Sequence, residues 1–530
     1  MNLPDASADA VPETNRNANV KRCPAAIPPG SPFQTIRPST WQYLGVIACV
    51  LMYSVPFLRV LTLRVDEGWC LTDAARVYHG QLPYRDFFEF VGPVTFYWIA
   101  LFFQLFGETW TATRICVFVI GTATAVLVHF IARWLKPGSE IMALIFWLAI
   151  LFPTWPAVNH HLIANLFALG AFALLLWWLD GANHMVLVPC GIAAGVTFAT
   201  MFPKGLALFA AFVIIVLRRD HRRISALVHF LAGCSIAILA GTGYFWTRGI
   251  LGDLCYANFL FPIRHYSQVG STPYGFGLGS HFWDIFGSLT SHIVGFPIAF
   301  ALWAPFALVF LLPAILVAIG ILRRSSFTEK TTPYWIAGSA LWLSEMHRPD
   351  LIHLVVASPV LIILLFSFVS RAFIRHLLLT SVAMLASVNL LVCLTAPIRM
   401  TTPVGSMALF ARNPVIEFTN SRVRPGASIF VYPYSPIYYF LARAVNPTRF
   451  SYLIYGQQTP GQVGEAVESI EKDRTRYVIW DTTFELTVTS SMPHYKPPPE
   501  AERIMEPYLN SRYTEIGRER GIRFLERKMQ

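Results

Sequence analysis

The sequence predicts an α-helical membrane protein that crosses the bilayer about eleven times and ends in a small α/β domain. Three observations support this fold class. The 530 residues are 55% hydrophobic and only 13% charged, whereas roughly 25% of residues are charged in a typical soluble domain. Long apolar runs recur along the chain, and short loops with clustered Arg and Lys separate them. After residue 396 these runs stop and the composition becomes that of a water-soluble domain.

The charge and cysteine patterns exclude several other classes of protein. Lys and Arg number 41 and Asp and Glu 30, which gives a net charge of +11. A nucleic-acid-binding protein would gather this surplus on one groove or helix face, but here it falls in short clusters, so we expect no nucleic-acid partner. The apolar content is too high for a disordered protein. The eight cysteines show no C-x-x-C spacing and are expected to be small buried hydrophobes.

Apolar runs of about 17–25 residues mark the candidate spans. The polar, Pro-rich residues 1–40 are predicted to be a disordered cytoplasmic tail, and the run 41–61 a signal-anchor helix. The predicted spans are 41–61, 112–134, 140–154, 161–179, 185–202, 204–218, 224–247, 292–321, 333–346, 351–369 and 374–396. Three of these, 140–154, 204–218 and 333–346, are short, so we expect them to tilt or to lie in thinned bilayer.

The basic loops set the orientation. With the amino terminus inside and eleven spans, every loop with clustered Arg or Lys lies in the cytoplasm, as the positive-inside rule requires. The segment 90–106 is also apolar, but as a further span it would move the basic cluster Arg218–Arg223 outside. We therefore interpret it as a re-entrant or membrane-surface helix. Loops with acidic and His residues then all lie on the extracytoplasmic side of the inner (plasma) membrane of a cell envelope.

Residues 397–530 follow the last predicted span and are expected to form a soluble extracytoplasmic domain. Strands alternate with helices there, which indicates a small α/β fold. We predict strands at 428–432 and 477–481, helices at 436–443, 465–473 and 501–512, and a closing hairpin over 513–527. The membrane domain that precedes it covers residues 41–396.

The first extracytoplasmic loop, residues 62–111, carries the most informative charges. Asp66-Glu67 follows the first span directly and lies beside Arg59 and Arg64. Nearby cations keep carboxylates ionised, and an ionised carboxylate can act as a general base for an acceptor hydroxyl. An ordinary solvated loop is the alternative interpretation. Further along, charges alternate with aromatic residues in Tyr84–Phe90, which is typical of an element at the lipid headgroup level.

Several short motifs follow one another in the first loop and the start of the next span: Asp66-Glu67-Gly68, Gly80-x-x-Pro83-Tyr84-Arg85-Asp86-Phe87-Phe88, Gly92-Pro93, Phe106-Gly107 and Arg114. Their order and spacing resemble the first extracytoplasmic loop of the GT-C membrane glycosyltransferases. The resemblance is closest to glycosyltransferase family 39, which contains the protein O-mannosyltransferases, the aminoarabinose transferases and bacterial relatives. The matching motifs cover about residues 41–135, and beyond that the likeness is architectural.

This resemblance implies that a sugar is transferred from a polyprenyl-phosphate donor to a protein, lipid or glycan acceptor. It implies that Asp66 is the catalytic base, that Glu67 assists it as a second catalytic residue, and that Glu89 lines the site. The aminoarabinose transferases have Glu-Lys-Pro-Pro where this chain reads Glu89-Phe90-Val91-Gly92-Pro93. The chain therefore departs from the pattern of that subgroup.

A donor phosphate requires cations at the membrane interface. Arg348 is the first candidate because Arg suits bidentate phosphate contact, and Asp350 and His353 at the same loop are expected to bind substrate or to orient Arg348. Lys204 is a second candidate, although a lone Lys at a helix end often extends to the headgroups. The other expected substrate-binding residues are Arg85, Asp86, Glu89, Arg264 and His265.

No cofactor is required by the pattern, although Asp66, Glu89 and His160 could ligate a divalent metal. Asn159-His160-His161 could equally be a polar helix cap. Three other functions stay open at this point. A transporter or flippase of lipid-linked sugars would place ionisable residues within the membrane and show repeated halves. A glycan polymerase or ligase would share the chemistry. A non-catalytic scaffold would have no need of the acidic loop.

Overall fold

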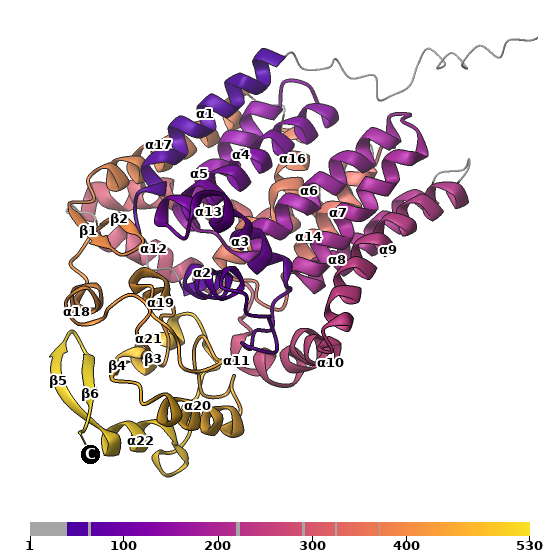
Figure 1. The fold of residues 1–530 in the computed structure, drawn as a ribbon. Helices are drawn as coiled ribbons and strands as arrows, with labels where there is room; N and C mark the ends of the chain where they lie inside the picture. Colours follow the sequence, from indigo (N-terminus) through magenta and orange to yellow (C-terminus); the bar gives the residue numbers. More distant parts are fainter. Residues whose placement is uncertain are drawn as a thin grey trace, which may run out of the picture.

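The computed structural model describes residues 40–61, 65–218, 223–288, 292–323, 326–369 and 372–529. The predicted cytoplasmic tail lies outside these residues except for Thr40. Two bodies share the described chain, a helical membrane domain and a smaller domain with a β-sheet at the carboxyl-terminal end (Figure 1). This arrangement confirms the predicted fold class.

The membrane domain contains a helical segment for each predicted span. These are α1 (Thr40–Leu58), α4 (Trp110–Leu135), α5 (Glu140–Thr154), α6 (His160–Leu179), α7 (Leu187–Thr200), α8 (Phe202–Leu217), α9 (Arg223–Thr247), α13 (His292–Leu322), α14 (Thr332–Leu343), the pair α15 (Leu351–Ala357) and α16 (Pro359–Phe368), and α17 (Ala372–Leu394). A short 3-10 turn, His184–Val186, leads into α7.

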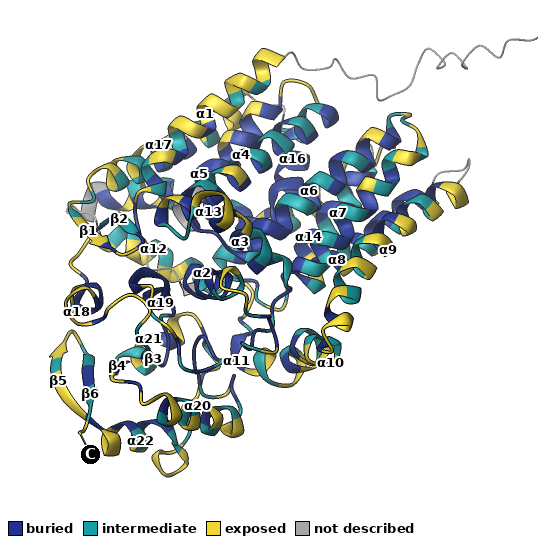
Figure 2. Ribbon diagram, in the orientation of Figure 1, coloured by how far each residue is buried: buried dark blue, intermediate teal, exposed yellow. Residues whose placement is uncertain are grey.

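Length separates these helices into two groups. Within the described residues, six are long and apolar enough to cross a membrane unaided, and a seventh span results if α15 and α16, which are bent by 66°, are counted together. Pro359 explains this bend, because proline has no N–H to continue the helical ladder. The outer helices α1 and α9 contain many exposed residues, several of them large and apolar, whereas most of α4 and α6 is buried or half-buried (Figure 2). Such exposed apolar faces are typical of contact with lipid.

Two loops of the membrane domain contain further helices. The first loop holds α2 (Val65–Tyr78) and α3 (Val94–Phe106), and α3 lies where a re-entrant or surface helix was predicted. Its path relative to the bilayer stays a prediction. The long loop after α9 contains α10 (Leu251–Cys255), two π-helical turns at Tyr256–Leu260 and Pro262–Tyr266, α11 (Ser267–Gly270) and α12 (Leu278–Gly287).

The carboxyl-terminal domain is built on a four-stranded sheet in the order β3-β4-β6-β5. β3 (Ile429–Tyr432) and β4 (Tyr477–Asp481) are parallel and joined through α19 (Ile437–Ala442) and α20 (Pro460–Asp473). β5 (Tyr513–Glu519) and β6 (Ile522–Arg527) form the expected hairpin. Its two turn residues, Arg520 and Gly521, both have positive φ, at 49° and 78°, as two-residue hairpin turns of type I′ require.

The remaining elements of this domain lie outside the four-stranded sheet. The strands β1 (Ile398–Thr402) and β2 (Gly405–Leu409) form a separate hairpin that the sequence did not predict, and α18 (Pro414–Arg422) was also missed. The two strands and α18 are short, and the apolar residues of α18 show little helical periodicity. The last helices are α21 (Phe484–Thr487) and α22 (Met505–Arg512), with 3-10 turns at Val488–Ser490 and Glu500–Glu502.

The two bodies meet at the first loop, which includes α2. The hydroxyl of Thr72 donates to the carbonyl of Pro436 at 2.8 Å, and the Phe88 amide donates to the carbonyl of Arg449 at 2.8 Å. Gly68 lies so close to α19 that a Cβ atom there would be 2.7 Å from the backbone nitrogen of Ile437. The carboxyl-terminal domain is thus packed directly on the first loop, and a glycine is needed at the contact.

We expect the substitution Gly68→Ala to loosen this junction. The added methyl group meets backbone, so the helices must move apart, at a cost of about 1–3 kcal/mol for overpacking. Thermal unfolding of the purified protein in detergent should show a lower midpoint, and limited proteolysis should release the carboxyl-terminal domain faster. Gly464→Ala is the matched control, because a Cβ at that α20 position meets nothing within 4 Å and alanine favours helix. An unchanged midpoint in Gly68→Ala would contradict the close contact.

Candidate active site

The first turn of α2 carries the two acidic residues that the sequence predicted to be catalytic, and the structure separates their environments. Glu67 is buried and forms an ion pair with Arg114 of α4. It also accepts a hydrogen bond from the Val158 amide at 3.2 Å. Asp66 is half-buried and, among the described residues, has no hydrogen bond or ion pair. Within the described residues the carboxylate of Asp66 is thus free of partners, whereas that of Glu67 is engaged by Arg114 and Val158.

Arg114 is held as firmly as its partner. Its guanidinium lies 3.8 Å from the centre of the Trp110 ring and donates to the Pro156 carbonyl at 3.3 Å. The pair thus connects the start of α2 to α4 and to the turn before α6. Arg114 was one of the residues that carried the sequence resemblance. Its contact with Glu67 links the start of α2 to α4.

Five side chains share an electrostatic environment with Asp66, and we call these five, together with Asp66, the central cluster. Its members are Asp66, Glu89, Tyr266, Arg348, Tyr434 and Tyr452. Burial raises the pKa of Tyr434, and the nearby charges of Asp66 and Glu89 raise it further. Burial likewise raises the pKa of Tyr452, with Glu89 and Asp66 again among the causes. These mutual effects indicate that the six groups lie within electrostatic range of one another.

Arg348 is oriented by three partners. Its Nη1 donates to the Tyr266 hydroxyl at 3.0 Å, its Nη2 to the Ser491 carbonyl at 3.1 Å and its Nε to Asp350 at 3.0 Å. Burial lowers the pKa of Arg348, but Tyr266, Asp350 and Asp66 outweigh it and hold that pKa above its ordinary value. Arg348 is thus a fixed positive charge in the same cluster as Asp66.

Asp350 and His353 support Arg348 from behind. The Asp350 carboxylate caps α15, accepting the backbone N–H groups of Ile352 and His353, and lies 2.6 Å from His353 Nδ1. Burial alone would raise the pKa of Asp350, but His353 and Arg348 reverse this and hold it well below its ordinary value. The structure therefore joins these three predicted residues, with Asp350 in contact with both Arg348 and His353.

Lys204 lies in a different environment from the open interface that the sequence predicted. Its side chain is fully buried, and its Nζ lies 2.9 Å from Glu345 Oε1. The same oxygen lies 3.4 Å from His161 Nδ1. The ammonium charge is therefore compensated within the protein. Glu345 precedes Arg348 by three residues, so this buried pair anchors the loop that carries Arg348.

A second acidic pair, Asp73 and Glu89, lies beneath the central cluster. Asp73 follows Asp66 by two helical turns on the same face of α2, and its Oδ1 accepts the Ser451 hydroxyl at 2.5 Å. Asp73 Oδ2 and Glu89 Oε2 are buried without a partner among the described residues. Burial raises the pKa of Asp73 to about 7. Burial and the Asp73 charge also raise the pKa of Glu89 well above its ordinary value. One proton shared between the two carboxyls satisfies both buried oxygens.

Four expected substrate-binding residues are not joined to the central cluster by any interaction among the described residues. Arg85 and Asp86 pair with each other at the surface, with Nε and Oδ1 2.8 Å apart. Arg264 is exposed, and the ring of His265 packs 5.2 Å from that of Phe261. The adjacent Tyr266 is the residue that reaches Arg348. Arg264, His265 and Tyr266 all belong to one π-helical turn. The sequence contains no signal for which side chain of this turn points inward.

Three contributors were missed because they come from the other end of the chain. Tyr434, Tyr452 and Ser491 all belong to the carboxyl-terminal domain, which packs over α2. Asp73 could have been found from its spacing of seven residues after Asp66. Among the described residues, no group of three or more His, Cys, Asp or Glu is placed to hold a metal ion. His160, one of the possible ligands, packs with its ring 5.4 Å from that of Trp69.

We expect the Asp73–Glu89 pair to make the stability of the protein pH-dependent. Because the folded state keeps a proton that the unfolded chain releases, the free energy of unfolding falls as pH rises from about 4 to about 7. Glu89→Gln keeps the shape without the ionisable group, so its thermal-unfolding midpoint in detergent should fall less over this range. The exposed Glu500→Gln is the charge-matched control and should follow the wild type. Equal slopes for Glu89→Gln and the wild type would contradict the shared proton.

Comparison with known proteins identifies the fold. No family model and no curated protein matches the chain. Among solved structures, it is similar to ArnT from Cupriavidus metallidurans bound to undecaprenyl phosphate, with a TM-score of 0.55 and 15% identity over 92% of this chain and 98% of that one. The archaeal oligosaccharyltransferase AglB from Archaeoglobus fulgidus, in complex with an inhibitory peptide and a dolichol-phosphate, aligns with a TM-score of 0.46 and 11% identity over 85% and 71% of the two chains.

The arabinofuranosyltransferase AftD from Mycobacteria aligns with a TM-score of 0.48 and 13% identity over 93% of this chain and 40% of that one. At these identities the likeness concerns the fold alone, and the ArnT alignment covers nearly all of both chains. The GT-C architecture that the first loop implied is confirmed, whereas family 39 is not. The chain is a polytopic membrane protein with the GT-C fold.

Proposed function

We propose that the protein is a membrane glycosyltransferase that moves a sugar from a polyprenyl-phosphate donor to an acceptor on the extracytoplasmic face of the inner membrane. One observation carries this proposal: Asp66, a carboxylate with no partner among the described residues, lies in the same cluster as Arg348, whose charge is fixed by its partners. The similarity in fold to a protein bound to undecaprenyl phosphate supports the class of donor.

Each of these two groups has a task in the reaction. Asp66 accepts the proton of the acceptor hydroxyl as its oxygen bonds to the anomeric carbon of the sugar. The bond from that carbon to the phosphate oxygen breaks, and the polyprenyl phosphate leaves with the electron pair. Arg348 compensates the charge on the leaving phosphate, which a fixed cation does without reorganisation. A direct displacement of this kind inverts the anomeric centre.

The other predicted residues act through these two. Glu67 fixes the start of α2 and thereby Asp66, and Lys204 anchors the Arg348 loop through Glu345. Glu89 keeps its proton with Asp73 and presents a neutral carboxyl beside the Asp66 charge. Arg85, Asp86, Arg264 and His265 lie on outer loops and stay predictions as contacts for the substrate or for lipid headgroups.

We expect Asp66→Asn to abolish transfer while the protein inserts and folds normally. Loss of a general base lowers the rate by about 10²–10⁴-fold. The measurement is mass spectrometry of surface glycans, lipids and envelope proteins from a deletion strain that carries either the wild type or the variant, with membrane levels checked by immunoblot. Asp284→Asn, which removes an exposed carboxylate from α12, is the control and should restore the wild-type spectrum. A normal spectrum from the Asp66 variant would remove the central claim.

We also expect Arg348→Gln to weaken the binding of undecaprenyl phosphate. Charge-assisted hydrogen bonds contribute about 1.5–3 kcal/mol, so the Kd should rise by roughly 10–150-fold. Titration of the purified protein in detergent, followed by intrinsic fluorescence, measures this change. Arg348→Lys keeps the charge and should bind more tightly than Arg348→Gln, and Arg412→Gln removes an exposed arginine of the carboxyl-terminal domain as a control. Equal Kd values for all four proteins would exclude Arg348 from the donor site.

A further inference from the structure

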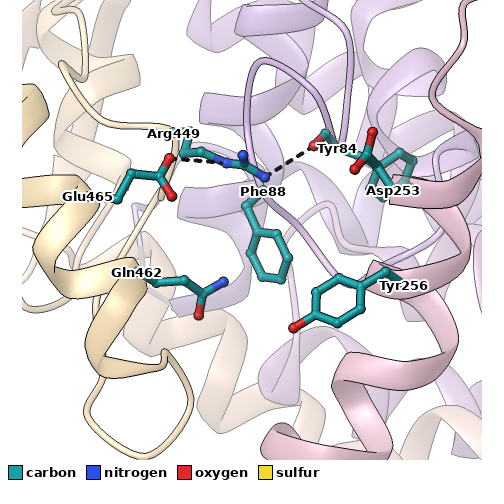
Figure 3. Close-up of a pocket in the computed structure, with 7 residues that line it drawn as sticks. All are labelled: Tyr84, Phe88, Asp253, Tyr256, Arg449, Gln462 and Glu465. Carbon is teal, nitrogen blue, oxygen red and sulfur yellow. Dashed lines mark hydrogen bonds and ion pairs between the residues drawn. The ribbon is translucent and has the colours of Figure 1, made fainter.

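A polar pocket lies where three parts of the chain meet (Figure 3). The first loop, the α10 region and the carboxyl-terminal domain each contribute to its wall. The lining residues are Tyr84, Phe88, Asp253, Tyr256, Arg449, Gln462 and Glu465. None of them belongs to the central cluster, and the sequence had indicated no site for Asp253, Tyr256, Arg449, Gln462 or Glu465.

The pocket adjoins the central cluster through an aromatic wall. Phe88 and Phe90 flank Glu89 in the sequence, and both pack on Phe261, with ring centres 4.7 and 5.6 Å apart. Phe90 in turn lies 4.6 Å from Tyr266, the partner of Arg348. The pocket is therefore next to the proposed reaction centre and separated from it by one layer of rings.

The chemistry of the lining matches a polyhydroxylated ligand. Two carboxylates accept hydrogen bonds, a guanidinium and an amide donate them, and the Tyr256 hydroxyl does both. The Gln462 amide and the rings of Phe88 and Tyr256 face the pocket in Figure 3. Sugar hydroxyls both donate and accept, and the C–H face of a sugar ring packs on aromatic rings. Binding sites of small molecules typically combine such surfaces with a few convergent polar groups.

Arg449 provides an unused donor at this site. It donates to the Tyr84 carbonyl at 3.2 Å, but its Nε is buried without a hydrogen-bond partner among the described residues. The nearest carboxylate oxygen, Glu465 Oε1, lies 3.7 Å away. An inserted hydroxyl would satisfy this N–H.

The charge of the pocket argues against the donor phosphate as its ligand. One arginine faces two carboxylates, Asp253 and Glu465, so the charged lining residues sum to −1. A negative lining repels an anion, whereas a neutral sugar carries no such penalty.

We propose that this pocket binds a sugar residue of the acceptor, which makes the acceptor a glycan. The proposal rests on the proposed glycosyl transfer, which it extends by naming the class of acceptor. Sugar binding in this pocket should depend on Tyr256 and Glu465 and not on Asp66 or Arg348.

Sugar binding in the polar pocket can be tested by saturation-transfer difference NMR on the full-length protein in nanodiscs of phosphatidylcholine and phosphatidylglycerol. The probes are methyl α-mannopyranoside, methyl β-glucopyranoside and methyl β-galactopyranoside, with a Ser-containing tetrapeptide as the competing class. We expect a saturation-transfer signal for at least one glycoside. In Tyr256→Ala and Glu465→Gln this signal should decrease by about fivefold or more. Glu468→Gln, one turn further along α20 and exposed, should keep the wild-type signal.

The outcomes separate this proposal from the proposed function. Absence of glycoside binding, binding that persists in both pocket variants, or binding of the peptide alone would each overturn the sugar pocket. Undecaprenyl phosphate binding is measured on the same samples and should be unchanged in the pocket variants. If glycoside binding depends on Tyr256 and Glu465 while Arg348→Gln leaves donor binding unchanged, the pocket stands and the assignment of the donor site fails.

Discussion

The site depends first on the buried ion pair between Glu67 and Arg114. Removal of one partner from such a pair leaves an uncompensated buried charge, which costs about 3–5 kcal/mol. The pair therefore holds α2 firmly against α4 and the turn at Pro156–Val158. Asp66 is the neighbour of Glu67 in the first helical turn, so the direction of its carboxylate is determined by the same constraint. Gly68, Thr72 and Asp73 on this helix then receive the carboxyl-terminal domain.

Most of the remaining charges near Asp66 compensate one another. Lys204 pairs with Glu345, and Asp350 pairs with both Arg348 and His353. Asp73 and Glu89 share a buried environment that favours a common proton. In a region of low dielectric, such networks are stable only when each member has its partner. Asp66 differs from its neighbours because it has no partner among the described residues, and a base must keep its carboxylate free for the substrate.

The carboxyl-terminal domain is part of the site and more than an appended module. It contributes Tyr434 and Tyr452 to the central cluster and the Ser491 carbonyl to Arg348. It also provides three of the seven residues of the polar pocket. A division of the chain into a catalytic membrane domain and a separate soluble domain would therefore leave two of the six residues of the central cluster, Tyr434 and Tyr452, outside the catalytic part. The first loop is the element that both bodies share.

The sequence alone predicted the helical segments, the strands β3 and β4 and the closing hairpin, all of which the structure contains, and it singled out Asp66 and Arg348 as candidate site residues. These features follow from local rules: the length of apolar runs, the alternation of strands and helices, the positive-inside distribution of basic residues and a motif within one loop. The partners of the charges were decided only by the tertiary structure. Glu67 meets Arg114 across 47 residues of sequence and Arg348 meets Tyr266 across 82, and no local pattern encodes such contacts. Folding brings these groups into an environment with little water, where each buried charge requires a partner, and the partner is whichever group the packing of the helices places within reach.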